Sequence, residues 1–191
     1  MIISNLSKSF GDKIILQNFS FSFPNTGVFA FTGNSGVGKT TLLRIIAGLD
    51  TEYSGQITDY SLSEISMSFQ EHRLFPWLTA LDNVLVSIEK PTSDNRKKAR
   101  ELLSTLGFTL EEMNLRPYAL SGGMKQRVSL CRAFMKSSKI YLLDEATKEL
   151  DRELATTVLD IIKEYSKRAI VIMTTHNASD IDYLGATEIK L

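Results

Sequence analysis

The sequence predicts an α/β fold with a mainly parallel sheet, an antiparallel β layer at the N-terminus and a helical insertion at about 71–136. Short β-branched and aromatic segments alternate with helical patterns toward both ends of the chain, whereas the middle is almost wholly helical. Three segments, 28–31, 140–143 and 170–173, are apolar without interruption. Such runs are typical of parallel strands that are buried on both faces.

The antiparallel layer is predicted by the two β-rich segments 1–6 and 14–23. Gly11-Asp12 supplies turn residues between them, and Pro24-Asn25 follows the second segment. The remaining strands are predicted at 28–31, 65–69, 140–143, 169–174 and 187–191.

Helical patterns separate these strands, at 39–47, 94–106, 122–136 and 152–167. Gly48 and Gly107 follow the first two patterns, and glycine commonly ends helices. Thr109 and Glu112 have the spacing of a capping box, which predicts a further short helix.

A length of 191 residues suits one domain. We therefore expect a single domain in which residues 1–70 and 137–191 form an α/β core with its β layer, and 71–136 form a helical subdomain.

The amino-acid composition limits the classes of function that this chain can have. Lys+Arg and Asp+Glu both number 22, and this balance argues against a broad electrostatic grip on nucleic acid or on an anionic membrane. Every apolar run is far shorter than the roughly 20 residues needed to span a bilayer, and the N-terminus lacks the layout of a signal peptide. The single cysteine, Cys131, lies on an apolar helical stripe and is interpreted as core.

A phosphate-binding loop is predicted directly after the strand at 28–31. The segment matches the pattern G-x-x-x-x-G-K-[ST] in full, and the helix at 39–47 follows it. The glycines let backbone N–H groups turn toward an anion, and the helix N-terminus adds positive dipole. The loop consists of Gly33, Asn34, Ser35, Gly36, Val37, Gly38, Lys39 and Thr40.

We expect Lys39 to reach the β- and γ-phosphates of a nucleotide and the Thr40 hydroxyl to ligate Mg²⁺. The alternative, a flexible turn with an incidental lysine, is disfavoured by the strand–loop–helix context. The fold class is therefore refined to a P-loop NTPase core.

Two carboxylates, Asp144 and Glu145, end the apolar strand at 140–143. Ligands of parallel sheets bind beyond the carboxyl ends of the strands, so Asp144 is expected near the phosphate loop. Asp144 can hold the hydration shell of Mg²⁺, and Glu145 can orient or deprotonate the attacking water. The alternative is a pair of solvated acids.

A second turn of small residues, Ser121-Gly122-Gly123, opens the helix at 122–136. Its hydroxyl and free N–H groups suit an anion, although Ser-Gly-Gly also makes an ordinary helix cap.

Together the three motifs resemble the nucleotide-binding ATPase subunit of an ABC transporter, and the resemblance covers essentially the whole chain. Residues 33–40 resemble its Walker A motif, 120–124 its signature motif and 140–145 its Walker B motif. Leu150-Asp151 resembles the end of its D-loop.

The resemblance also assigns roles to isolated residues. Gln70 would contact Mg²⁺ and the attacking water, His176 would hydrogen-bond the γ-phosphate, and Phe10 would stack on adenine. Without the resemblance, Gln70 is better interpreted as polar surface and His176 as a solvated loop residue. For Phe10, packing in the core stays an alternative even with the resemblance. The expected catalytic residues are Glu145, His176, Gln70 and Lys39. The expected Mg²⁺ ligands are Thr40, Gln70 and Asp144. The expected nucleotide-binding residues are Phe10, residues 33–40, Thr41, Ser121, Gly122 and Gly123.

The resemblance implies ATP hydrolysis with Mg²⁺ and a homodimer in the ATP-bound state, in which each signature turn covers the γ-phosphate of the other subunit. Residues 74–84 resemble those of importers for nitrate, sulfonate, taurine and thiamine precursors. There Phe75 and Trp77 would receive a helix of a membrane permease, unless Trp77 packs inside its own helical subdomain.

A solute-binding protein would complete the transporter, and the chain would lie on the cytoplasmic face of the membrane. Nucleic acid is not an expected partner. The competing functions are an ABC ATPase that acts on nucleic acid or ribosomes and a nucleotide-binding subunit without turnover.

This sequence departs from the family pattern in three places. Met124 stands where glutamine is common, Ala146 stands where proline usually comes, and Lys148-Glu149 replaces the small residues of the D-loop. No proposed catalytic group is removed.

Overall fold

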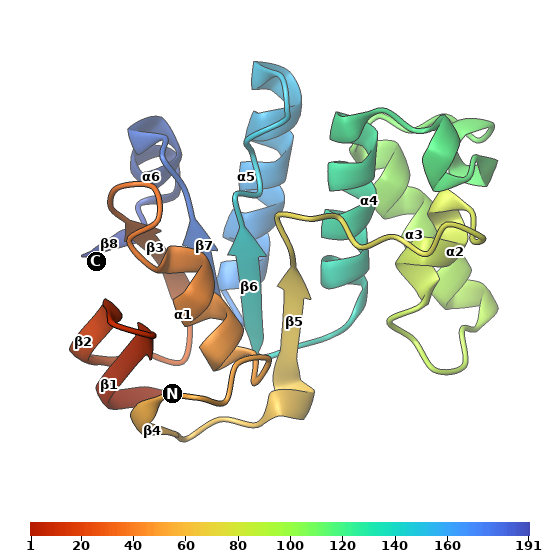
Figure 1. Cartoon of the computed structure of the whole chain (residues 1–191). Helices are drawn as coiled ribbons and strands as arrows, with labels where there is room; N and C mark the ends of the chain where they lie inside the picture. Colours follow the sequence, from red (N-terminus) through yellow and green to blue (C-terminus); the bar gives the residue numbers. More distant parts are fainter.

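A five-stranded parallel sheet forms the centre of the molecule in the computed structural model, which describes residues 1–191. Its strand order is β5-β6-β7-β3-β8 (Figure 1). The strands are β3 (Gly27–Thr32), β5 (Ile65–Ser68), β6 (Ile140–Asp144), β7 (Ile170–Thr174) and β8 (Thr187–Lys190). This arrangement confirms the predicted α/β fold.

The N-terminal layer is a separate antiparallel sheet of order β2-β1-β4. β1 (Ile2–Phe10) and β2 (Lys13–Ser22) form the predicted hairpin around Gly11-Asp12. The third strand, β4 (Ser54–Thr58), was not predicted, because Ile57 is its only apolar residue and the rest of the strand is exposed. It is added by pairing with β1, not by a pattern of its own.

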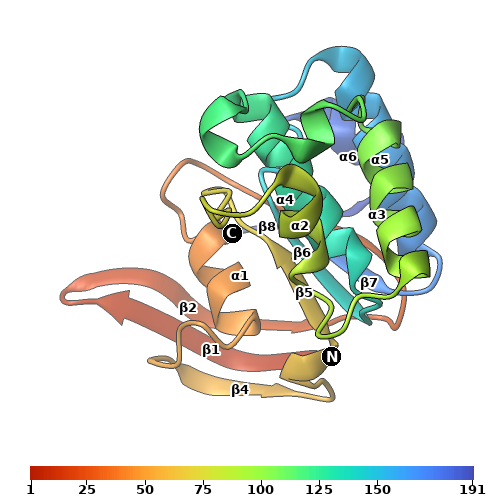
Figure 2. The same cartoon turned by 90° about the vertical axis from the view of Figure 1, so that its right-hand side faces the viewer.

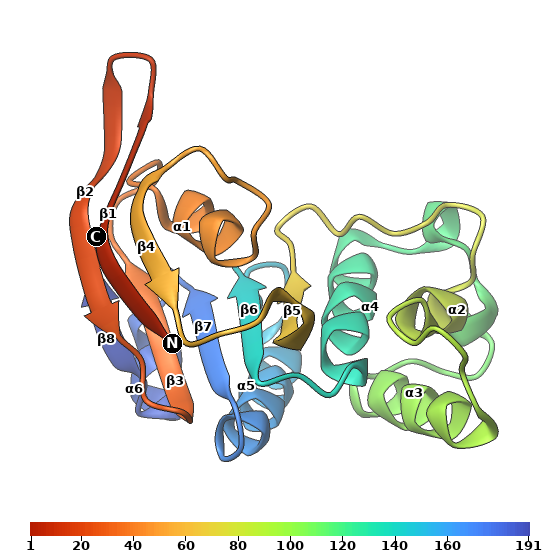
Figure 3. The same ribbon diagram turned by 90° about the horizontal axis from the view of Figure 1, so that it is seen from below.

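Alternation along the central strands divides the core into two clusters. Ile140 and Leu142 face one cluster with α1 (Lys39–Ile46) and the antiparallel layer. Tyr141 and Leu143 face the other, with α4 (Gly122–Met135), α5 (Arg152–Ser166) and part of α6 (Ala178–Leu184). Successive side chains of a strand point to opposite faces, so a continuously apolar strand supplies both clusters. Figure 2 shows α1 directly above the antiparallel layer, and Figure 3 shows α5 on the opposite face of the sheet.

Between β5 and β6 every regular element is helical, and these elements stand to one side of the sheet (Figures 1 and 3). They are α2 (Ala80–Leu85), α3 (Ser93–Thr105), η2 (Glu112–Asn114), η3 (Pro117–Ala119) and α4 (Gly122–Met135). The predicted capping box forms: the Thr109 N–H donates to Glu112 Oε2 at 2.8 Å, and the Glu112 N–H donates to Thr109 Oγ1 at 3.2 Å. Cys131 is fully buried, as its stripe predicted.

None of the helices combines the length and the apolar character that crossing a bilayer requires.

Strand register brings the predicted motifs to one edge of the sheet. Asp144 pairs with Thr174 across β6 and β7, and Thr174 pairs with Phe31 of β3. The phosphate loop leaves β3 just beyond Phe31, so it begins beside the carboxyl ends of β6 and β7. This is the edge at which parallel sheets bind ligands.

Candidate active site

The phosphate loop is shaped by glycines in backbone conformations that other residues rarely adopt. Gly36 has φ +77° and Gly38 has φ +116°. A Cβ at Gly38 would lie 2.6 Å from Cγ2 of Ile15, so β2 packs directly against the loop there. At Gly36 a Cβ would meet nothing within 4 Å, so this part of the loop is open.

Lys39 is placed at the centre of the loop by the first turn of α1. Its ammonium donates hydrogen bonds to the carbonyl oxygens of Gly33, at 2.8 Å, and Asn34, at 3.0 Å. The side chain is almost completely buried. The lysine side chain and the glycine-rich loop thus line the same small cavity, and such a loop at a helix N-terminus suits a phosphate chain.

Asp144 is buried to 1% exposure at the end of β6. Its Oδ1 accepts hydrogen bonds from Thr174 Oγ1 at 2.7 Å and from Thr40 Oγ1 at 3.2 Å. Burial raises the pKa of Asp144, while the two threonine hydroxyls act in the opposite direction. A buried carboxylate beside the Thr40 hydroxyl is the hard oxygen donor set that Mg²⁺ prefers, so these residues fit the ion.

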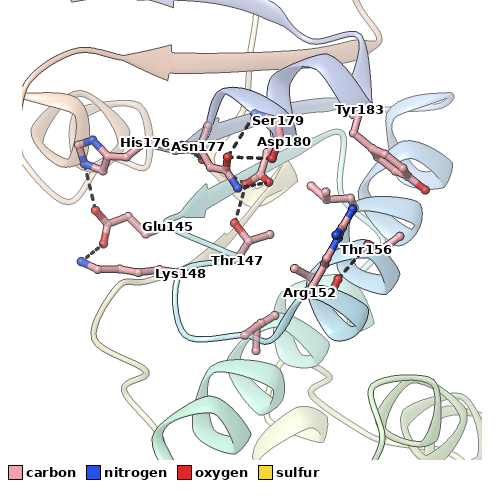
Figure 4. A pocket seen from close by; sticks show the side chains of 14 residues that line it. Glu145, Thr147, Lys148, Arg152, Thr156, His176, Asn177, Ser179, Asp180 and Tyr183 are labelled. Atoms are coloured by element: carbon pink, nitrogen blue, oxygen red, sulfur yellow. Dashed lines mark hydrogen bonds and ion pairs between the residues drawn. The ribbon is translucent and has the colours of Figure 1, made fainter.

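Glu145 begins the loop after β6 with φ +51°, a left-handed conformation uncommon for glutamate. Its N–H donates to Thr174 Oγ1 at 2.9 Å, which fixes the backbone. Its carboxylate lies between two side chains: Oε2 is 2.6 Å from Lys148 Nζ and Oε1 is 3.4 Å from His176 Nε2 (Figure 4). The carboxylate of Glu145 is therefore held by the side chains of Lys148 and His176, whereas that of Asp144 is held by threonine hydroxyl groups.

Most of the predicted site residues line one cavity of about 280 Å³. Those that line it are Ser35, Gly36, Gly38, Lys39, Thr40, Thr41, Gln70, Asp144, Glu145 and His176. Gly33, Asn34 and Val37 belong to the same loop, but do not form the wall of the cavity.

Sequence reasoning missed three residues of this cavity, Ile15, Lys148 and Thr174. Ile15 and Thr174 carry no motif, and only strand packing and register bring them to the site. Lys148 stands out in the D-loop and could have been found from its position three residues after Glu145, because a local turn brings the two side chains together.

Phe10 lies outside the cavity, at the end of β1, with 54% of its surface exposed. The Lys8 ammonium lies 4.7 Å from the centroid of the ring. Lys8 is buried and is held by Asp50 Oδ1 at 2.8 Å and by the carbonyl oxygen of Glu52 at 2.6 Å.

The signature turn also lies outside the cavity. Ser121 caps α4, where its hydroxyl accepts a hydrogen bond from the Met124 N–H at 3.2 Å. Gly122 and Gly123 pack against Glu149: Cβ atoms there would lie 2.8 Å from its Oε2 and 3.0 Å from its carbonyl oxygen. Within one chain, the structure does not bring this turn and the phosphate loop into one cavity.

A larger cavity of about 860 Å³ lies beside the first and shares Glu145, Lys148 and His176 with it (Figure 4). Its opposite side comes from α5 and α6. Asp180, buried in this wall, accepts hydrogen bonds from Thr147 and Thr175 through Oδ2, at 2.7 and 3.2 Å. The loop after Glu145 is thereby tied to the segment that carries His176.

The chain is similar to ATP-binding proteins of transporters. Residues 16–148 match the family described as ABC transporter. The aliphatic sulfonates import ATP-binding protein SsuB of Bacillus subtilis is 36% identical over 181 residues, which cover 90% of this chain and 70% of the relative. The putative hemin import ATP-binding protein HrtA of Staphylococcus haemolyticus is 34% identical over 205 residues, covering 95% and 92%.

A solved structure shares the whole fold. The ATP-binding cassette MJ0796, in a dimeric post-hydrolysis state bound to ADP and Pi, superimposes with a TM-score of 0.85 at 29% identity. The match covers 100% of this chain and 93% of that one. The motifs, their meeting at one sheet edge and these similarities agree, and the chain belongs to the ABC transporter family as one of its ATP-binding, ATP-hydrolysing subunits.

Proposed function

We propose that this chain powers a bacterial importer. It would be a peripheral subunit on the cytoplasmic face of a membrane permease, and a solute-binding protein would deliver the solute to that permease. The observation that carries this proposal is an exposed aromatic pair in the helical region. Phe75 and Trp77 are 37% and 65% exposed, and their ring centroids lie 5.4 Å apart. Trp77 is therefore not packed inside its own subdomain. Aromatic side chains of this kind concentrate binding energy at interfaces.

The segment that carries the pair is held firmly in place. Asn83, fully buried in α2, accepts a hydrogen bond from the Phe75 N–H at 2.8 Å and donates to the carbonyl oxygens of Phe75, Leu78 and Thr79. A fixed backbone with exposed rings suits the docking of a partner, because little conformational entropy is lost on binding. The import proteins among the similar sequences support the same direction of transport.

For the chemistry, we propose that Lys39 and the loop 33–40, continued by Thr41, hold the phosphates of ATP, and that Phe10 stacks on the base. Thr40, Gln70 and Asp144 would hold Mg²⁺, which neutralises phosphate charge when it is bound.

Glu145 would orient the attacking water and accept its proton, while His176 would hydrogen-bond the γ-phosphate. The carboxylate and the imidazole line the same cavity as Lys39, which supports this division of roles. We propose that residues 1–191 act as one ATPase domain with a helical subdomain at 71–136.

The docking role is tested by Trp77→Glu in the purified chain and in cells that carry the permease. Because Trp77 is exposed, we expect an unchanged fold and an ATPase rate within twofold of the wild type, together with loss of permease co-purification. Leu110→Glu is the matched control, since Leu110 is 69% exposed in the same helical region but lies outside the aromatic segment. Retained co-purification of Trp77→Glu would contradict the proposal.

A further inference from the structure

Both carboxylate oxygens of Glu145 are engaged within the chain. Lys148 Nζ lies 2.6 Å from Oε2, and His176 Nε2 lies 3.4 Å from Oε1. The Glu145 side chain is 14% exposed, whereas that of Lys148 is 57% exposed. The hydrogen bond to Glu145 raises the pKa of Lys148, so the lysine is charged. A largely buried anion is thus balanced by a cation that stands at the surface.

Of this pair, the Lys148 side chain is the one that can move, because hydrogen bonds hold the backbone of Glu145. The Glu145 N–H is bonded to Thr174, and its carbonyl oxygen accepts from Gln126 Nε2 at 3.4 Å and from the Lys148 N–H at 3.2 Å. The last of these bonds closes a turn that places the two side chains face to face. Glu145 is therefore anchored on both sides, while the end of the lysine side chain is free to leave through solvent.

The neighbouring residue ties the same loop to the signature turn. Oε2 of Glu149 lies 2.8 Å from where a Cβ of Gly122 would stand, and it is 3.7 Å from His72 Nε2. The Glu149 backbone packs equally closely against Gly123. A displacement of the N-terminus of α4 would therefore move Glu149, and with it the adjacent Lys148.

We propose that Lys148 is a positioning residue that restrains the Glu145 carboxylate in the isolated chain and releases it when this loop moves with the N-terminus of α4. While the ammonium is bonded to Oε2, it occupies one of the two oxygens that could accept the proton of a water molecule. The isolated subunit is thereby kept slow. The inference rests on the proposed role of Glu145 as the base.

The first test compares steady-state ATP hydrolysis by the full chain with that of Lys148→Ser. We expect kcat to rise about two- to fivefold, the range for loss of a partly exposed ion pair, with KM for ATP unchanged. Lys148→Arg keeps a cation within reach and should restore the low rate. The matched control is Lys167→Ser, which removes another Lys–Glu pair of the same spacing, Lys167 with Glu164, far from the site.

The second test needs no nucleotide. The side-chain ammonium of Lys148 should give a distinct NMR signal, shifted by its hydrogen bond, and Glu145→Gln should return it toward the position of the other exposed lysines. A kcat of Lys148→Ser that falls or stays the same, or a Lys148 signal that Glu145→Gln leaves unmoved, would overturn the inference.

The same variants separate this inference from the proposed function. If Glu145→Gln still hydrolyses ATP, the assignment of the base is wrong. If Glu145→Gln is inactive while Lys148→Ser is no faster than the wild type, only the restraint fails.

Discussion

Asp144 and Glu145 are adjacent in the sequence, but their carboxylates have different surroundings. Asp144 is the last residue of β6 and is buried among threonine hydroxyls. Glu145 turns away in a left-handed conformation and reaches Lys148 and His176. Two acids that neighbour each other in sequence can thus serve a metal and a water molecule separately.

Lys8 is another charged residue whose surroundings are set by the fold. Its ammonium is buried between β1 and the loop before β4, where Asp50 neutralises it. The hydrogen bond from Lys8 holds the pKa of Asp50 below its usual value. Since Lys8 also lies over the ring of Phe10, this ion pair supports the proposed adenine platform.

We expect Asp50→Asn to lower the free energy of unfolding at pH 7 by about 1–2 kcal/mol, because a buried ammonium loses its counter-charge. A carboxyl whose pKa is lowered in the folded state contributes stability above its unfolded pKa of about 3.9 and loses it as the pH falls through the folded value. The difference between the two proteins should therefore shrink below about pH 4, as measured by urea unfolding.

Glu52→Gln is the control for this comparison, since its carboxylate is 92% exposed and lies 3.9 Å from Lys8. Equal effects of the two substitutions would contradict a specific role of Asp50.

At the scale of elements, the contact between β2 and the phosphate loop positions the start of α1. Ile15 fills the space where Gly38 has no side chain, and it also lines the cavity. The antiparallel layer therefore contributes to the site although it carries no motif in that segment.

We expect Gly38→Ala to destabilise the chain by about 1–3 kcal/mol, because it adds a clash with Ile15 to the strain of a positive φ. The midpoint of thermal unfolding measures this. Gly36→Ala is the matched comparison: it carries a positive φ as well, but its new methyl group meets nothing within 4 Å. A Gly36→Ala protein that is as unstable as Gly38→Ala would show that strain alone decides the result.

At the scale of the whole molecule, the phosphate loop and the signature turn are separate surfaces of one chain. The structurally similar cassette MJ0796 is dimeric. A two-fold dimer, in which the signature turn of each chain covers the nucleotide of the other, would unite both anion-binding elements around one triphosphate.

We expect Glu145→Gln to form a stable dimer with saturating ATP, since hydrolysis can no longer remove the γ-phosphate that joins the two chains. The wild type with ADP should remain monomeric. Adding Ser121→Arg should abolish the dimer while nucleotide still binds to the phosphate loop. Light scattering distinguishes these states, and a monomeric Glu145→Gln protein at saturating ATP would count against dimerisation without the permease.

The sequence alone determined the α/β class, the central strands and the phosphate loop. Continuous apolar runs such as 140–143 are typical of strands buried on both faces, and a loop of glycines that ends in Lys39-Thr40 is specified by local geometry. Chain order and register then place Asp144 beside Thr40.

Other features were decided only by tertiary structure, since they depend on contacts between segments without a pattern of their own. β4 exists because β1 offers it an edge, Trp77 is exposed because its segment is fixed by the buried Asn83, and Thr174 enters the site through strand register. The pairing of Lys148 with Glu145 is more local, since both residues belong to one turn that the Lys148 N–H closes on the Glu145 carbonyl oxygen. The sequence shows an unusual lysine, but only the left-handed turn at Glu145 brings the two charges together.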